Sequence, residues 1–246
     1  MLMQCGMDDA GGDGRLAASW LGAATLESLA EMNETCLALL AEQAAAGPPG
    51  ALLREIGTLW RTLDREARGR AAAVPYLLLD GGFADRARWR QPMPQVADPA
   101  RGACPAFFTV PGTVEAARLL FGWAWHLARA ESAAAHLLLG MSAGCATLIA
   151  GCTLRHMHTL AERHPEWLRP RWPAHPELWR GLLLAAGSGE PRALARARLH
   201  GLTMLAAEAR RAAGAGAAAG GPGRAPLTSP AGTTSTAPSP RSPARP

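Results

Sequence analysis

Residues 137–164 read LLLGMSAGCATLIAGCTLRHMHTLAERH, and this stretch predicts two short helices separated by a Gly-Cys-Thr break. Ser142 is expected to cap a first helix that ends near Ala150, and Thr153 a second helix that ends near Arg163. A side-chain oxygen at each cap accepts backbone N–H groups that a helix start leaves unpaired. A helix, a tight turn and a second helix have the outline of a helix-turn-helix.

The second predicted helix has an apolar side and a basic side. Its apolar residues recur at spacings of three and four, which places them on one buried face: Leu154, Met157, Leu160 and Ala161. The remaining polar and basic residues are directed outward and are the candidates for direct DNA contacts: Arg155, His156, His158, Thr159 and Arg163. In groove-reading helices, the early residues approach the base edges.

A proline-rich connector, residues 165–176, follows this helix. It alternates Trp167 and Trp172 with Arg169 and Arg171. Basic groups interleaved with flat rings are typical of contacts with a nucleic acid backbone, so we expect Arg169 and Arg171 to bind phosphates. The alternative is that the tryptophans hold the connector against the core.

Positions between residues 121 and 178 carry a resemblance to a known family: Ala133, Ala135, Leu139, Gly140, Ala146, Thr147, Ala150, Thr153, Leu154, Met157, Leu160, Ala161, Glu162, Arg171 and His175. This segment resembles FlhD, a subunit of the bacterial flagellar master transcriptional regulator. A shorter stretch, Glu31-Met32-Asn33 followed by residues 37–41, is similar to the first helix of that family.

The resemblance implies a dimer that works with an FlhC-like partner subunit to activate flagellar or related genes. DNA would be contacted directly or through that partner. The family's cysteine that cross-links two subunits falls on Leu168, so the resemblance provides no covalent dimer at this position. The alternative function is a non-catalytic helical protein–protein interaction module that does not bind DNA.

Charge is distributed unevenly along the 246 residues, whose net charge is +5 and whose 25 basic residues are all arginines. Residues 17–117 contain nine arginines and eleven acidic residues, whereas residues 118–211 contain twelve arginines and six acidic residues. The second half is therefore the basic one, as expected of a domain that binds phosphates.

Neither a catalytic centre nor a metal site is predicted. The closest approach to a metal-ligand spacing is Cys152 with His156 and His158, and no second cluster completes a tetrahedral set. No Gly-x-Ser-x-Gly, His-Glu-x-x-His or phosphate-loop motif is present, and there is no lysine for a Schiff base. We therefore expect a protein that is not an enzyme and that needs no cofactor or metal.

Five segments are predicted from the changes in composition. Residues 1–16 form a flexible start, 17–83 an N-terminal helical unit, 84–112 a proline-rich loop, 113–211 the FlhD-like helical domain, and 212–246 a disordered tail rich in Ala, Gly, Pro, Ser and Thr. The expected fold class is all-α, a helical bundle with a helix-turn-helix-like C-terminal domain. No signal peptide or transmembrane run is recognisable in the sequence, which predicts a cytoplasmic protein.

Apolar periodicity places the other helices at residues 16–46, 51–70, 113–135 and 191–211. The apolar run 71–79 leaves two possibilities, a buried helix closed by glycines or a buried strand that leads into a phosphate loop at Asp80-Gly81-Gly82. The glycines do not continue into a Gly-x-Gly-x-x-Gly motif, so the buried helix is favoured.

Overall fold

The computed structural model describes residues 22–46, 50–90 and 105–219. Almost all regular structure in these ranges is helical. The elements, in chain order, are α2 (Ala23–Ala46), α3 (Ala51–Thr62), α4 (Arg65–Ala72), β1 (Leu79–Asp80), α5 (Arg86–Trp89), α6 (Thr113–Ala130), α7 (Ser132–Leu139), α8 (Ala143–Ala150), α9 (Leu154–Arg163), the 3-10 turn η1 (Pro165–Trp167), β2 (Arg169–Pro170), α10 (Pro176–Ser188) and α11 (Pro191–Ala219).

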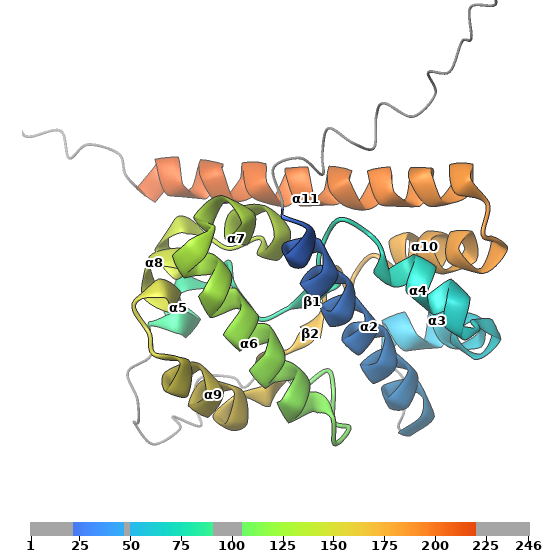
Figure 1. Ribbon diagram of the computed structural model, residues 1–246, viewed down its shortest axis with the longest axis horizontal. Coiled ribbons are helices and arrows are strands. Elements are labelled where there is room, and N and C mark those ends of the chain that lie inside the picture. The colour runs from blue at the N-terminus through green and yellow to red at the C-terminus, as the bar shows by residue number, and fades with distance from the viewer. Residues whose placement is uncertain (1–21, 47–49, 91–104, 220–246) are drawn as a thin grey trace, which may run out of the picture.

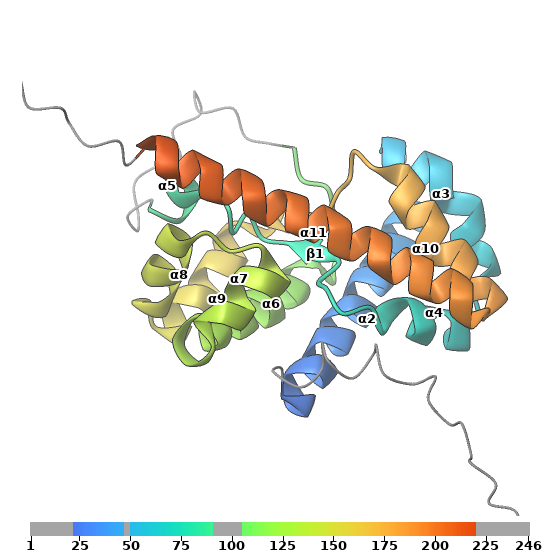
Figure 2. The same cartoon turned by 90° about the horizontal axis from the view of Figure 1, so that it is seen from above.

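Two groups of helices are joined in the middle by a short antiparallel pairing of β1 and β2 (Figure 1). Helices α6 to α9 form one group, and α3, α4 and α10 form the other, with α2 in contact with both α4 and α6. Figure 2 shows α11 crossing over both groups. The buried apolar residues of the two groups make one core cluster, so the two helical units predicted at residues 17–83 and 113–211 share their interior.

The segment after α4 is a turn and a series of bends that lead into β1, so the predicted helix at residues 71–79 is wrong beyond its first two residues. Pro75 lacks a backbone N–H and disfavours a helical conformation at the residue before it. The side chain of Asn33, fully buried in α2, forms hydrogen bonds with the backbone of this segment instead. Its amide nitrogen donates to the carbonyls of Ala72 and Tyr76, both at 3.0 Å, and its oxygen accepts from the Leu78 N–H at 2.8 Å.

The helix predicted at residues 113–135 is divided into two, α6 and α7, with a change of direction at Glu131. The apolar residues that recur at spacings of three and four along α6 are buried: Ala117, Leu120, Phe121, Ala124 and Leu127. Trp123 and Trp125 both pack in part against the core, so neither is directed fully outward.

The predicted loop contains an unexpected element, α5, whose Trp89 is buried. In the connector 165–176, the interpretation that tryptophans hold the chain against the core is confirmed. Trp167 and Trp172 are buried, and the indole N–H of Trp179, which is fully buried in α10, donates to the Arg171 carbonyl at 3.0 Å. Helix α10 has no counterpart among the helices predicted from the sequence.

Helix α11 extends to Ala219, beyond its predicted end at Arg211, and the rest of the predicted tail lies outside the described residues, as do residues 1–16. Two features hold α11 in place. Gly201 is buried directly against the ring of Tyr76, where a β-carbon would overlap the phenol. The carboxylate of Glu208 accepts from Arg171 Nη2 at 2.7 Å and from the Trp172 indole at 2.6 Å.

Candidate nucleic-acid interface

The two helices predicted from the opening stretch are both present with the predicted caps. Ser142 Oγ accepts from the Cys145 N–H at 3.3 Å and starts α8, and Thr153 Oγ1 accepts from the His156 N–H at 3.2 Å and starts α9. Both helices pack against α6. The local structure of this segment is therefore the one that its capping residues encode.

The buried side of α9 is formed by three of the four predicted residues, Met157, Leu160 and Ala161. The prediction that Leu154 is also buried is wrong, because 43 % of its surface is exposed. It lies at the edge of the contact with α6, where a β-carbon added to Gly122 would be 3.7 Å from Leu154 Cδ1.

The predicted DNA-contact residues on the outward side of α9 differ in their exposure to solvent. Arg155 and His158 are exposed, and within the described ranges neither side chain forms a hydrogen bond or ion pair. Arg163 is exposed as well, near the C-terminal end of the helix. His156 and Thr159 are half-buried, and the Thr159 hydroxyl donates to the Arg155 carbonyl at 3.0 Å.

An acidic residue interrupts this surface near the end of α9. Glu162 Oε1 lies 2.7 Å from Arg118 Nη2, and Glu115 Oε2 lies 3.1 Å from Arg118 Nη1. The Arg118 guanidinium donates hydrogen bonds to the Glu162 and Glu115 carboxylates, which raise its pKa, and it is thereby shared between two acids. Arg118 is therefore balanced by acidic residues, whereas Arg155 on the first half of α9 has no such partner among the described residues.

The prediction that Arg171 contacts phosphates is wrong. Only 5 % of this residue is exposed, and its guanidinium is bound to the Glu208 carboxylate and to the Leu138 carbonyl, the latter at 2.8 Å. A buried guanidinium needs such partners, and here they join α11 and α7 to the connector. Arg169 is half-buried in β2, opposite Asp80, and so lies apart from the outward side of α9.

One basic residue near α9 was not identified from the sequence. Arg129, exposed on the last turn of α6, lies with its guanidinium carbon 4.8 Å from the centre of the Trp125 ring. The Trp125 indole N–H donates to the Cys152 carbonyl, in the break between α8 and α9, at 2.8 Å. The spacing of four residues between Trp125 and Arg129 was the available signal, since residues i and i+4 of a helix are neighbours.

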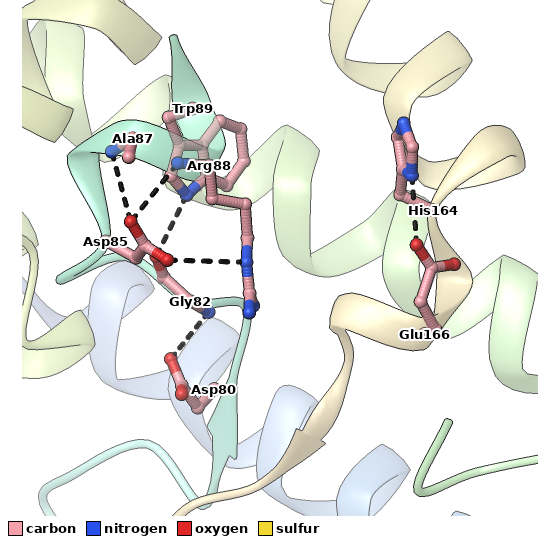
Figure 3. Close-up of polar contacts among 8 residues, drawn as sticks. All are labelled: Asp80, Gly82, Asp85, Ala87, Arg88, Trp89, His164 and Glu166. Carbon is pink, nitrogen blue, oxygen red and sulfur yellow. Dashed lines mark hydrogen bonds and ion pairs between the residues drawn. The ribbon is translucent and has the colours of Figure 1, made fainter. Parts of the chain in front are cut away.

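Polar residues also gather between β1 and α5, but they bind one another. In Figure 3 the Asp80 carboxylate accepts from the Gly82 N–H at 2.8 Å, and Asp85 caps α5. The Gly82 amide, which the phosphate-loop alternative would require for a ligand, is thus occupied by Asp80.

The same view shows His164 beside Glu166, with 2.9 Å between His164 Nδ1 and Glu166 Oε1. The His164 ring also stacks on Trp167 with a centroid separation of 4.6 Å, and the Arg88 guanidinium lies 5.6 Å from the Trp167 ring centroid. These contacts connect α5 to the chain after α9.

The cysteines near α9 have the environment of packed thiols. Burial raises the pKa values of both Cys145 and Cys152, and the Cys152 thiol donates to the Leu148 carbonyl at 3.2 Å. In the described ranges no three His, Cys, Asp or Glu residues come together in a way that could hold a metal ion. Likewise, no helix of these ranges has the length and apolar character to span a bilayer.

Comparison with known proteins identifies no relative: no protein family, curated protein or solved structure matches the chain.

Proposed function

We propose that this chain is an FlhD-like subunit of a transcription regulator that binds DNA through α9, alone or together with an FlhC-like partner, and controls flagellar or related genes. The observation that carries the proposal is the pair Arg155 and His158. Both side chains are exposed, without intramolecular partners in the described ranges, on the first two turns of a helix whose start is capped and whose other side is buried. Recognition helices present the residues of their first turns in this manner.

The packing of the FlhD-like segments also supports the proposal. The stretch 31–41 lies in α2 and the stretch 121–178 begins in α6, and these two helices contact each other across the core (Figure 1). Segments separated by about eighty residues of sequence thus belong to one folded unit, as they would if both came from one ancestral domain.

The test compares the binding of full-length variants to duplex DNA by fluorescence anisotropy over a series of salt concentrations. Replacing Arg155 and His158 together by alanine should weaken binding at least tenfold and reduce its dependence on salt, because fewer phosphates are neutralised. The matched control removes the same two residue types from the exposed side of α11, by Arg192→Ala with His200→Ala. Equal affinity of the α9 double variant and the wild type would contradict the proposal.

A second candidate function is the helical interaction module that does not bind DNA. It is favoured by the outer side of α11, where 64 % of Leu199 and 37 % of Leu202 are exposed. Exposed leucines on one helix face are typical of a contact with another protein. Under this alternative the wild-type chain does not bind duplex DNA even at low salt, whereas substitution of the two leucines by serine changes its association state in sedimentation experiments.

A further inference from the structure

We propose that Arg129 is a phosphate-contacting residue of the same interface and that Trp125 positions it beside the break between α8 and α9. This inference rests on the proposed function, and it extends the interface from α9 to the last turn of α6.

The position of Arg129 follows from two contacts. The Trp125 ring is fixed at one side by its hydrogen bond to the Cys152 carbonyl, 2.8 Å long, and the Arg129 guanidinium lies on that ring at 4.8 Å. Cys152 directly precedes Thr153, the cap of α9. The guanidinium is therefore held near the start of the helix that carries Arg155 and His158.

Stacking on an indole leaves the donors of a guanidinium available. The N–H groups of arginine lie in the plane of the group and point outward from its edge, so a ring below the plane does not compete for them. A phosphate can then accept two parallel hydrogen bonds from that edge. Trp125 thus reduces the freedom of Arg129 without occupying its hydrogen-bonding groups.

The surrounding charges distinguish Arg129 from two other arginines, Arg118 and Arg171. Arg118 is shared by Glu115 and Glu162, and Arg171 is buried against Glu208. Arg129 has no carboxylate within ion-pair distance among the described residues, although its side chain is exposed and ordered on a ring. A phosphate group would supply the missing counter-charge.

The experiment uses full-length variants and mixed-sequence duplex DNA, with anisotropy titrations at several salt concentrations. Arg129→Ala should weaken binding roughly tenfold and lower the slope of log K against log salt by about one. Arg129→Lys keeps the charge but not the planar fork, and should restore the slope while recovering only part of the affinity. The control, Arg196→Ala, removes an exposed arginine from α11 and should change neither quantity.

Trp125→Phe tests the positioning role, because it keeps an aromatic ring and removes the indole N–H. Binding should weaken, and adding Arg129→Ala to this variant should cost less affinity than it does in the wild type. Melting temperatures of all variants identify any loss of binding that comes from unfolding.

The outcomes separate this inference from the function on which it rests. If Arg129→Ala binds like the wild type while the Arg155 and His158 double variant is weakened, the role of Arg129 is refuted and α9 remains the interface. If the double variant binds normally, the proposed function fails. Absence of DNA binding by the wild-type chain at low salt, both alone and with an FlhC-like partner, overturns both.

Discussion

At the scale of single residues, Asn33 has the most influence on the path of the chain. One buried amide replaces the hydrogen bonds that a helix or a sheet would give to residues 72–78. Since an unpaired backbone group in the core is costly, this side chain stabilises the irregular conformation of the segment.

Replacing Asn33 by leucine should lower the free energy of unfolding by at least about 3 kcal/mol. Each of the three backbone groups left without a partner costs about 1–3 kcal/mol, and the new apolar contacts return only part of that sum. Urea unfolding measures the change. The neighbouring exposed residue provides the control, because Glu34→Ala should stay within about 0.5 kcal/mol of the wild type. A loss below 1 kcal/mol for the leucine variant would show that other groups or water serve this backbone.

The residues whose roles were predicted correctly from the sequence are those whose roles depend on neighbouring positions in the chain. Ser142 and Thr153 cap helices whose first turns follow directly, so their role could be recognised without knowledge of the fold. Arg171 could not be assigned, because its partner Glu208 is separated from it by 37 positions and comes from another helix. A basic residue between tryptophans has the same local pattern whether it contacts phosphate or carboxylate.

At the scale of elements, the difference between local and distant contacts likewise explains which helices could be predicted from the sequence. The division between α6 and α7 was missed because Ala134, Ala135, Leu138 and Leu139 continue the apolar spacing of the preceding helix. The irregular segment at 71–79 was missed because its continuous apolar composition suits any buried element. For residues 71–79 the contacts that the composition does not reveal come from a distant residue, Asn33 in α2.

The packing of α11 against Tyr76 gives a prediction at this scale. It compares two glycines that lie inside helices. Gly201→Ala should lower the free energy of unfolding by about 1–3 kcal/mol, because its β-carbon would overlap the buried Tyr76 ring. Gly181→Ala in α10, where a β-carbon meets no atom within 4 Å, should raise it by about 0.5–1 kcal/mol through better helix propensity. Denaturant unfolding of the pair checks both signs. If the Gly201→Ala substitution stabilised the protein, α11 would not pack closely against Tyr76 at this position.

At the scale of the whole molecule, the common core predicts cooperative unfolding. Helix α10 packs on α3 and α4, and α2 packs on α6, so neither predicted domain buries its apolar surface alone. Calorimetry of the full chain should therefore show one transition with equal calorimetric and van't Hoff enthalpies. The isolated fragment 113–211 should have no cooperative transition, since α2 and β1 are missing from its core. Two separated transitions in the full chain would contradict this prediction.

The pairing of β1 with β2 has a consequence for folding during synthesis on the ribosome. The fully buried run Tyr76–Leu79 leads into β1, which gains its partner strand only when Arg169 and Pro170 have been made, roughly ninety residues later. At a synthesis rate of about 5–20 residues per second, this apolar segment of the nascent chain is without its partner strand for on the order of ten seconds. During that interval the growing polypeptide is a natural client for chaperones that shield apolar stretches, and its first half matures only after most of the second has been translated.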